Sequence, residues 1–484
     1  MALEIWTVAD LNNVRNNLIG EYIQMADIDL VGMNWVPIGN AVVGGFSGIY
    51  NGNGFTISNL YIQDTSNVYA LGLFGQSEGY CSFRNITLDT VNVGGNGYCQ
   101  SALIGHYLNT QTGNFAEITN CHVENMNLVG TGNSYMIGGL IGESEAFKIE
   151  NCTAQGSIIG VTDLGGLVGR NKGTPTPETV RSKFYRCFSN IVITGTGSSI
   201  TPGRYGGLIA SSSYTDFSEC YSIGSIDAIK PPAGMLGWSV GGIAAVCDSD
   251  TFANCYARMN IRSTFSTDTF IGGFVGFNQR STFLNCYSAG IITLLSAYID
   301  TVGGFCLDIN NEALIVNCYY DLQNSSLTYH NGSAYPMTTV EMKTQITFVD
   351  WDFATVWKIN PLLNDGYPCF VVTPELPPKV PPAYMDILWE TPESDFGSPG
   401  YLKIADMFYC TLQGTGQMRV DFIFDGNIKS LIIDCPIEET IIRKRIRHKG
   451  KLIKLVFSNI GGNKFTMKNP VLMYEVIDDS RGVR

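Results

Sequence analysis

A repeat that returns at nearly constant spacing constrains the fold of this chain more than any other feature. Each copy has a strand-like Gly-Gly-Leu-Ile/Val-Gly run, a polar stretch, an aromatic residue or Ile, and then Asn-Cys or an equivalent pair. The recurring cysteines are Cys121, Cys152, Cys187, Cys220, Cys255, Cys286 and Cys318, at spacings of 31, 35, 33, 35, 31 and 32 residues. Three short strand-like runs per repeat, without a helical period, predict one coil of a parallel β-helix (β-solenoid) per repeat.

The composition agrees with an all-β chain. The 484 residues include 54 Gly, 25 Phe and 24 Tyr, which favours strands and turns over helices. Equivalent runs in successive coils would pair in parallel at about 4.8 Å per rung, so about nine coils between residues 40 and 335 would form a right-handed rod about 45 Å long. We expect caps over about 1–40 and 336–372, and outer loops at polar inserts such as 172–181.

The corners of the coil are predicted from two local patterns. Ile149 and Cys152 are three residues apart, so strict strand alternation would send their side chains to opposite faces. Both can face inward if a corner or bulge lies at Asn151, because Asn tolerates the left-handed conformation. The paired glycines of each coil indicate either a tight corner or a close approach of two backbones.

The cysteine column is predicted to be part of the core. Equivalent thiols in successive coils would stack inward and behave as small hydrophobic side chains. The remaining seven of the 14 cysteines form no Cys-x-x-Cys pair, and the chain has only four His. This pattern does not indicate a zinc site, and we expect no metal and no cofactor.

The repeat resembles the GLUG motif, which forms β-helices in bacterial surface proteins and phage-borne proteins. Outside the coils, the resemblance rests on WTVADL at 6–11, YIQMADIDL at 22–30, WVPIG at 35–39, FSGIYNGNG at 46–54, MTT at 337–339, WDF at 351–353, Trp357 and GYP at 366–368. It covers about three-quarters of the chain and is specific for fold. For function, it implies only a rod displayed outside a cell.

A Pro-rich connector at 373–384 separates the solenoid from a second domain at 385–484. Five prolines between residues 373 and 382 can neither join a β-ladder nor continue a helix. The last hundred residues hold 14 of the 30 Lys and Arg against 13 Asp and Glu, so their net charge is +1 and that of the preceding part is −14. Strand-like runs at 402–412, 418–424, 430–433, 452–457 and 471–476 predict a small antiparallel β-sandwich.

This C-terminal part resembles the closing β-sandwich of phage tail proteins of the nozzle and tail-hub types. The resemblance rests on WET at 389–391, DFGSPGYLK at 395–403, VDFIFDG at 420–426, RKRIRHKGK at 443–451 and YEVIDDSRGVR at 474–484. A β-propeller usually supplies the bulk of nozzle proteins, and here a solenoid takes its place. The resemblance therefore implies docking to a tail more than a conduit for DNA.

A dense basic run within this domain is the candidate docking surface. Its residues are Arg443, Lys444, Arg445, Arg447, Lys449 and Lys451. One interpretation is a solvated edge strand that basic side chains protect from aggregation. A second is an electrostatic dock for an acidic neighbouring subunit. A third is contact with DNA in a tail lumen, although one short run is a small footprint for nucleic acid.

Two further sets of residues are candidate sites. A polysaccharide-cleaving tailspike would need carboxylates facing each other in a groove, and the candidates near coil corners are Glu143, Glu145, Asp163, Asp248 and Asp250. We interpret them as solvated loop carboxylates and predict no catalytic residue. Aromatic side chains that could stack on sugar rings from loops, or instead belong to caps or core, are Tyr107, Tyr135, Tyr214 and Trp238.

These observations predict a structural virion protein of a tailed bacteriophage, made in the host cytoplasm and assembled into the tail. No secretory signal peptide is recognisable, and no stretch approaches 18 consecutive apolar residues. The expected partners are other tail or portal-proximal proteins, further copies of the chain, a host surface glycan or protein, and possible DNA in a tail lumen. The alternatives are a glycan-degrading tailspike, a nozzle subunit at the DNA exit and a bacterial surface adhesin.

Overall fold

The repeat folds into stacked coils, each with four strands rather than the predicted three. The computed structural model describes residues 2–64, 68–109, 116–131, 134–173, 181–197, 203–229, 238–264, 269–294, 301–307, 313–325, 327, 334–372, 389–390, 402–414, 417–424, 427–434, 440–450, 453–460 and 465–477. Most of the predicted outer loop at 172–181, the Pro-rich connector at 373–384 and Lys451 lie outside these residues. The chain divides into two compact units, Met1–Val380 and Pro381–Arg484.

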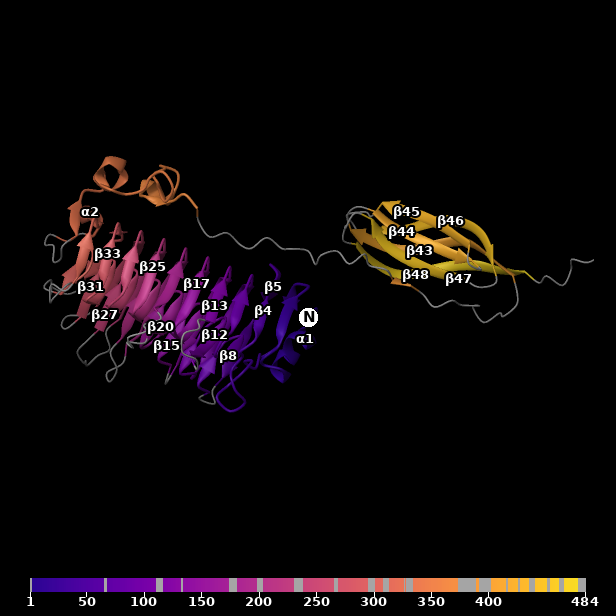
Figure 1. Cartoon of the computed structure of the whole chain (residues 1–484), viewed down its shortest axis with the longest axis horizontal. Helices are drawn as coiled ribbons and strands as arrows, with labels where there is room; N and C mark the ends of the chain where they lie inside the picture. Colours follow the sequence, from indigo (N-terminus) through magenta and orange to yellow (C-terminus); the bar gives the residue numbers. More distant parts are fainter. Residues whose placement is uncertain are drawn as a thin grey trace, which may run out of the picture. The chain divides into compact units, whose positions relative to one another are not determined.

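One complete coil shows the plan of the first unit (Figure 1). It contains β15 (Met136–Gly138), β16 (Ile141–Glu145), β17 (Phe147–Glu150) and β18 (Thr153–Gly160). Each strand pairs in parallel with its equivalents in the neighbouring coils, so the solenoid has four parallel sheets. We name each sheet after the strand that this coil contributes.

The strands of the four sheets follow the order of the coils. The β15 sheet contains β7 (Ala70–Leu71), β11 (Cys99–Gln100), β15, β19 (Asp163–Gly165), β23 (Arg204–Gly206), β27 (Trp238–Gly241), β31 (Thr269–Gly272) and β36 (Val302–Gly303). The β16 sheet contains β8 (Phe74–Glu78), β12 (Ile104–Leu108), β16, β20 (Val168–Lys172), β24 (Ile209–Ser213), β28 (Ala244–Asp248) and β32 (Val275–Gln279).

The other two sheets are longer because they continue into the ends of the solenoid. The β17 sheet contains β1 (Leu3–Ile5), β2 (Glu21–Gln24), β4 (Ile49–Asn51), β9 (Ser82–Arg84), β13 (Ala116–Thr119), β17, β21 (Ser182–Tyr185), β25 (Thr215–Ser218), β29 (Thr251–Ala253), β33 (Thr282–Leu284) and β37 (Leu314–Val316). The β18 sheet contains β3 (Ile28–Asp29), β5 (Thr56–Ser58), β6 (Tyr61–Asp64), β10 (Thr87–Gly95), β14 (His122–Gly130), β18, β22 (Phe188–Gly195), β26 (Tyr221–Ala228), β30 (Tyr256–Ser263), β34 (Tyr287–Ser288), β35 (Ile292–Leu294), β38 (Tyr319–Asp321) and β39 (Tyr335–Met337).

The predicted all-β parallel solenoid is confirmed, but the number of complete coils is smaller than expected. Seven coils have strands on all four sides among the described residues, because the β16 sheet has seven strands. The predicted number, about nine, included coils at the ends of the solenoid that lack a strand on at least one of the four sides. At the N-terminal end, α1 (Val8–Asn13) and η1 (Val14–Asn16) bury Leu11 and Val14 completely, within the residues predicted as a cap.

The left-handed corner predicted at Asn151 is confirmed and recurs in every coil of the cysteine column. The residues before the seven cysteines have positive φ: Asn120, Asn151, Arg186, Glu219, Asn254, Asn285 and Asn317, all between 51° and 53°. Ile149 and Cys152 are consequently both fully buried. The seven column cysteines are at most 1% exposed, which confirms their place in the core. Their thiols donate to backbone carbonyls, as Cys152 does to Glu150 over 3.2 Å.

The paired glycines are explained by close backbone approach. Neither Gly165 nor Gly166 has a left-handed φ, but a Cβ atom at Gly166 would overlap the carbonyl oxygen of Gly207 in the next coil. A Cβ at Gly165 would likewise overlap the carbonyl oxygen of Val168. Glycine is needed at these positions because the β15 and β16 sheets meet there within two residues.

We predict that Gly166→Ala destabilises the solenoid, because the new methyl group must push apart two backbones that cannot move independently. The free energy of unfolding should fall by about 1–3 kcal/mol or more. Gly94→Ala is the matched control, since its Cβ would meet only the end of the Gln63 side chain at 2.8 Å. Denaturant midpoints of the two variants test this, and equal midpoints would contradict the close-approach explanation.

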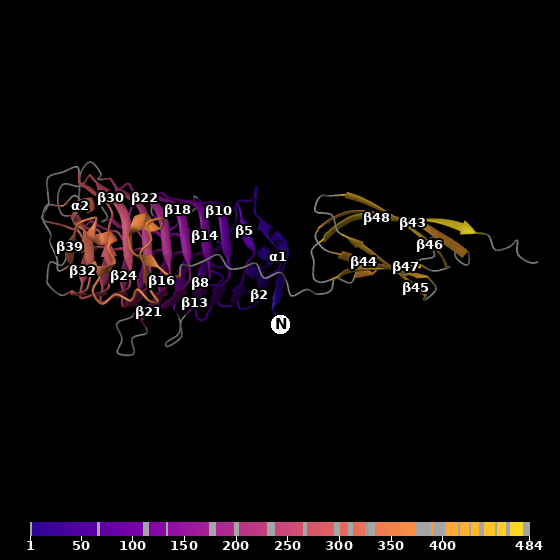
Figure 2. The same ribbon diagram turned by 90° about the horizontal axis from the view of Figure 1, so that it is seen from above.

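The segment predicted as a C-terminal cap has a different course. Its first strand, β39, extends the β18 sheet at its end. Residues 338–371, which we call the strap, then fold back along the outer side of the coils (Figures 1 and 2). The strap contains η2 (Glu341–Lys343), η3 (Gln345–Thr347), β40 (Trp357–Lys358), η4 (Asn364–Gly366) and β41 (Cys369–Phe370). It covers a column of outward tyrosines that follow the cysteines: Tyr221, Tyr256, Tyr287 and Tyr319.

The strap is held by ring packing and by polar contacts. Tyr221 and Tyr256 stack at 4.6 Å, and Tyr256 and Tyr287 stack at 5.1 Å. Trp357 is fully buried against this column and donates from Nε1 to Asn254 Oδ1 at 3.4 Å. The Tyr287 hydroxyl donates to the carbonyl oxygen of Pro368 at 2.6 Å. The strap therefore ties several coils together along one side.

We predict that Trp357→Ala releases the strap while leaving the coils folded. Loss of a fully buried Trp should cost about 3–5 kcal/mol, and the strap is the part that this side chain anchors. Limited proteolysis should then cut within 338–371 faster than in the wild type. Trp6→Ala, at a Trp that is 45% exposed, should leave the cleavage rate unchanged. An equally protected strap in both variants would contradict this assignment.

The C-terminal unit is the predicted pair of antiparallel sheets. One sheet has the order β42 (Trp389–Glu390), β47 (Ile453–Ile460), β44 (Gln417–Phe424) and β45 (Asn427–Asp434). The other has the order β46 (Thr440–Gly450), β43 (Leu402–Gly414) and β48 (Phe465–Ile477). Met418, Val420 and Phe422 are fully buried, at alternate positions of β44. A further short helix, α2 (Leu322–Ser325), belongs to the solenoid unit.

Candidate functional site

The aromatic residues that were candidates for sugar contact divide into two groups. Tyr107 and Trp238 are buried in the solenoid core, so the sugar-contact interpretation is wrong for them and the core alternative holds. The Tyr107 hydroxyl donates to the carbonyl oxygen of Gly79 at 2.7 Å. Tyr135 and Tyr214 are half-buried and remain accessible. Sequence position alone could not separate these groups, because both lie beside coil corners.

The interpretation of the carboxylates as solvated loop residues is wrong for three of the five. Glu143, Asp163 and Asp250 lie on or beside strands and are at most 2% exposed. Glu145 and Asp248 are partly exposed strand ends, as a solvated role requires. Burial of a carboxylate is costly unless partners compensate for the lost hydration. The three buried groups therefore mark the polar sites of this solenoid.

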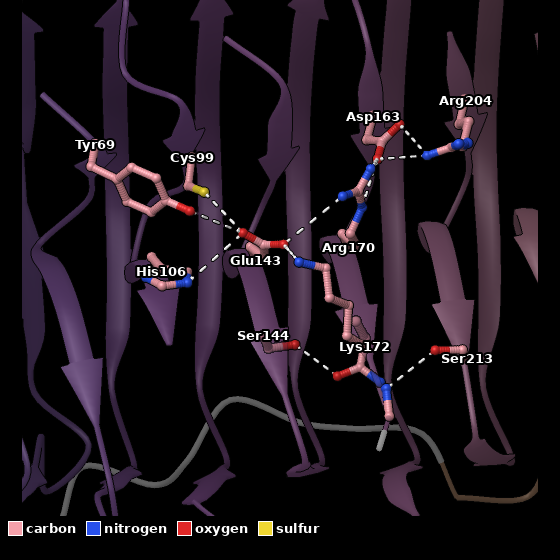
Figure 3. Close-up of polar contacts among 12 residues, drawn as sticks. Tyr69, Cys99, His106, Glu143, Ser144, Asp163, Arg170, Lys172, Arg204 and Ser213 are labelled. Carbon is pink, nitrogen blue, oxygen red and sulfur yellow. Dashed lines mark hydrogen bonds and ion pairs between the residues drawn. The ribbon is translucent and has the colours of Figure 1, made fainter. Parts of the chain in front are cut away.

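Glu143 and Asp163 are brought together by the narrow corner between the β15 and β16 sheets (Figure 3). Glu143 lies between His106 and Arg170 in its column of equivalent residues. Asp163 lies between Met136 and Arg204 in the facing column. Because only two residues separate the strands at this corner, long side chains from the two columns reach one another.

Glu143 collects contacts from three coils. Its Oε2 accepts from the Tyr69 hydroxyl at 3.4 Å and from the Cys99 thiol at 3.7 Å, and it lies 3.8 Å from His106 Nε2. Its Oε1 lies 2.5 Å from Lys172 Nζ, without hydrogen-bond geometry. The carboxylate is thus surrounded by donors and one close cation.

Asp163 is held by two guanidinium groups. Arg170 donates to its Oδ2 from Nε at 3.0 Å and from an Nη atom at 2.7 Å. Arg204 contacts both carboxylate oxygens at 3.3 and 3.4 Å. Arg170 also approaches Glu143 Oε1 at 4.0 Å, so its side chain bridges the two carboxylates. Such paired contacts compensate for complete burial of Asp163.

The protonation states follow from burial and from these neighbours. Burial raises the pKa of Asp163, although Arg204 and Arg170 oppose the shift. Burial lowers the pKa of His106, and Lys172 lowers it further against the effect of Glu143, so the imidazole is neutral at pH 7. Burial, followed by the charge of Glu143, raises the pKa of Cys99 well above its usual value. Cys99 is therefore a thiol that donates, not a thiolate nucleophile.

A ladder of tyrosines borders this cluster and was only partly anticipated. Tyr69 and Tyr98 stack at 5.3 Å, and Tyr98 and Tyr135 lie 4.7 Å apart. The three residues directly precede the register-matched residues Ala70, Cys99 and Met136. Tyr135 was predicted as an exposed aromatic, whereas Tyr69 and Tyr98 were missed. Their common place before the Gly-rich run of each coil was the available signal.

Asp250 forms a separate site inside the solenoid. Its Oδ1 accepts from the Thr215 backbone N–H at 2.8 Å, and its own N–H donates to Ser281 Oγ at 3.1 Å. Burial raises the pKa of Asp250 to about 8, although the Thr215 N–H favours the charged form. At neutral pH this carboxyl is therefore mainly protonated, and it serves as an uncharged part of the core.

We predict that Asp250→Asn makes stability less dependent on pH. The pKa of Asp250 is raised on folding from 3.8 to about 8, so its contribution is fully present below about pH 4 and is lost as the pH rises to about 8. This loss amounts to roughly 6 kcal/mol at most. The free energy of unfolding of Asp250→Asn relative to the wild type should increase from pH 5 to pH 8. Asp227→Asn is the control, because its side chain is 39% exposed and paired with Arg262 on the β18 sheet, and its difference from the wild type should change much less over this range. A flat Asp250→Asn difference would refute this role.

The basic run lies at an edge of the C-terminal unit. Arg443, Lys444, Arg445, Arg447 and Lys449 belong to β46. Among the described strands, β46 pairs only with β43 and ends its sheet. This position fits the edge-strand interpretation, and docking through these residues stays a prediction.

Two classes of feature are not found in the described part of the chain. No three His, Cys, Asp or Glu side chains among those residues gather closely enough to hold a metal ion. No helix in the described ranges has the length and apolar character needed to cross a bilayer.

Comparison with known sequences adds one decisive match. Residues 133–159 match the profile of the GLUG motif. This stretch begins just before β15 and ends within β18, so the matched motif is one complete coil. The chain is a β-helix repeat protein. The resemblance drawn from the repeat is thereby confirmed for this coil, and register pairing relates the other coils of the β-helix protein to it.

Two curated proteins are similar to this chain in sequence. A protein of Evansella cellulosilytica with the provisional name of Gly-rich membrane protein is 30% identical over 395 residues. The match covers 75% of this chain and 44% of that protein. Halomucin of Haloquadratum walsbyi is 27% identical over 217 residues, which cover 36% of this chain and 2% of halomucin. The β-helix protein therefore spans less than half the length of either relative.

A match among the solved structures is also reported for its extent. It is a crystal structure from Bacteroides ovatus with the provisional name of immunoglobulin A1 protease. The match has a TM-score of 0.45 and 17% identity, and covers 76% of this chain and 92% of that structure. A similarity of this size adds nothing to the description of the β-helix protein.

Proposed function

We propose that the chain is a structural display protein, in which the solenoid is a rigid stem and the C-terminal unit attaches it to a carrier. The observation that supports this most strongly is the in-register core of seven complete coils. Equivalent residues pair over the whole stack, and the strap fastens the outer side of several coils. Such a rod gains its stability from contacts between neighbouring repeats and can hold a surface away from its carrier.

The carrier in this proposal is the tail of a bacteriophage. Support comes from the resemblance of the C-terminal unit to the closing sandwich of tail proteins. A basic strand at a sheet edge, β46, also suits contact with an acidic neighbouring subunit. The partners would be tail or portal-proximal proteins and further copies of the chain, with the solenoid as spacer or host-binding element. The protein would be synthesised in the host cytoplasm and reside in the virion.

A cell-surface adhesin is the second candidate. It is favoured by the names of the two relatives, one a Gly-rich membrane protein and the other a halomucin. Both candidates share the display role of the stem and differ only in the carrier.

The proposed role is not enzymatic. Glycoside hydrolysis needs two carboxyl groups that both reach the scissile bond. Asp163 and Asp250 are buried and occupied by internal partners, and Glu143 is buried beside Lys172. These contacts support a structural use of the three carboxyl groups.

Charge reversal on β46 tests the docking part of this proposal. Arg443→Glu, Arg445→Glu and Arg447→Glu together should lower the amount of protein in purified particles at least tenfold, because the proposed acidic neighbour would repel the new carboxylates. Arg419→Glu, Lys429→Glu and Lys454→Glu reverse as many charges on the other sheet and should leave incorporation unchanged. Both proteins should retain the wild-type circular dichroism spectrum.

Electron microscopy of particles carrying an epitope-labelled chain tests the carrier. Label on the tails supports the phage proposal. Label confined to the cell envelope would overturn it in favour of the adhesin. Equal incorporation of the two triple variants would show that β46 is not the dock.

A further inference from the structure

We propose that the outer flank of the first coils binds an acidic glycan, meaning a polysaccharide whose sugar units carry carboxylate groups. The flank is formed by Tyr69, Tyr98, Tyr135, Arg170, Lys172 and Arg204, and we call it the Tyr-Arg flank. This inference rests on the proposed display role and names the class of ligand that the stem contacts.

The tyrosine ladder supplies the surface on which sugar rings can stack. Tyr69 is 43% exposed, and Tyr98 and Tyr135 are half-exposed. One tyrosine comes from each of three successive coils, and coils follow one another at about 4.8 Å. A pyranose unit has a similar length, so a chain of sugars that runs along the solenoid axis can meet one ring per coil. Tyrosine side chains suit such ligands, because the ring is apolar and the hydroxyl group is polar.

The charges of the flank favour an anion. Three cations, Arg170, Lys172 and Arg204, surround the buried carboxylates of Glu143 and Asp163. The partly exposed Glu145 pairs in register with Lys172. The carboxylates of Glu143 and Asp163 are 3% and 0% exposed, whereas the Lys172 side chain is 49% exposed. Solvent therefore meets the positive groups in a chain whose net charge is −13. A carboxylated sugar placed on the tyrosines would find its counter-charge there.

The small number of exposed cations on the flank distinguishes the ligand from a nucleic acid. A nucleic-acid strand presents one phosphate per nucleotide and is usually met by a row of basic side chains. Here three cations lie beside three aromatic rings, and in the next coil the residues paired with Arg204 and Arg170 are Ser239 and Ser211. A few charges beside a continuous row of aromatic rings fit a glycan better than a nucleic acid.

Glu143 acts as a positioning residue for the flank. Its buried carboxylate lies 2.5 Å from Lys172 Nζ and accepts a hydrogen bond from the Tyr69 hydroxyl. It therefore fixes the positions of one cation and of one ring of the tyrosine ladder. Oε1 accepts no hydrogen bond from the described residues. Asp163 fixes the two guanidinium groups in the same way.

Binding of the full-length chain to polygalacturonate tests this inference, with the fully methyl-esterified polymer as neutral control. Calorimetry should detect binding of the acidic polymer that weakens with added salt, and at least tenfold weaker binding of the esterified polymer. Lys172→Gln and Arg204→Gln should each weaken binding at least fivefold, and Tyr98→Leu should do the same through loss of stacking. Lys148→Gln is the matched control, because its side chain is 42% exposed and paired with carboxylates on the β17 sheet.

Other results would overturn the inference. These are absence of binding to both polygalacturonate and polysialate, equal binding of the esterified polymer, or equal loss in Lys148→Gln and Lys172→Gln. A further such result is an affinity for polygalacturonate that Tyr98→Leu leaves unchanged, together with an equal affinity for single-stranded DNA. It would indicate a general polyanion surface and overturn the inference as well. The display proposal is tested separately by location on particles, so a labelled tail without glycan binding would refute this inference alone.

Discussion

Parallel pairing of equivalent residues between coils is the interaction on which the rest of the structure depends. It requires that each coil return to the same position after 31 to 35 residues, although loops of different length leave the coils. The left-handed corner before each column cysteine makes this possible, because it lets both Ile149 and Cys152 face the core. Once the corner is fixed, the column cysteines and the paired glycines of each coil stack on their equivalents in the next coil. Side chains on the outer faces are then placed by register alone, and both the strap and the Tyr-Arg flank follow from that placement.

The corner, the core column and the parallel sheets could be predicted because each depends on a pattern within one repeat. Asn151 and its equivalents occur at a fixed offset from Cys, and inward packing of Ile149 and Cys152 admits few backbone conformations. The fourth strand was missed because the Gly-rich run folds as two strands, β15 and β16, around a two-residue corner. The connection of Glu143 to Asp163 through Arg170 was missed for the same reason. It depends on the outer faces of two sheets meeting at that corner, which no spacing within the repeat indicates.

The three buried carboxyl groups show how the same chemical group serves two purposes in one solenoid. Asp163 lies on the outer side, where two guanidinium groups compensate for its burial. Asp250 lies inside, where its carboxyl accepts from the Thr215 backbone N–H, and its pKa is raised to about 8. At the flank, ion pairing stabilises the charged carboxylate of Asp163. In the core, protonation leaves Asp250 without a charge. Composition and net charge could not distinguish the two cases, because both residues follow apolar or small neighbours in the sequence.

The strap has a consequence for how such a chain can change in length. The tyrosines beneath it follow Cys220, Cys255, Cys286 and Cys318, whereas the residues after Cys121 and Cys152 are His122 and Thr153. A coil duplicated among the tyrosine-bearing repeats would shift the strap anchors, such as Trp357 on Asn254, out of step with their partners. A coil duplicated near residues 121–153 would leave every anchor in place. The solenoid can therefore gain whole repeats on its N-terminal side but not under the strap. The two ends of the solenoid differ in the insertions that they tolerate.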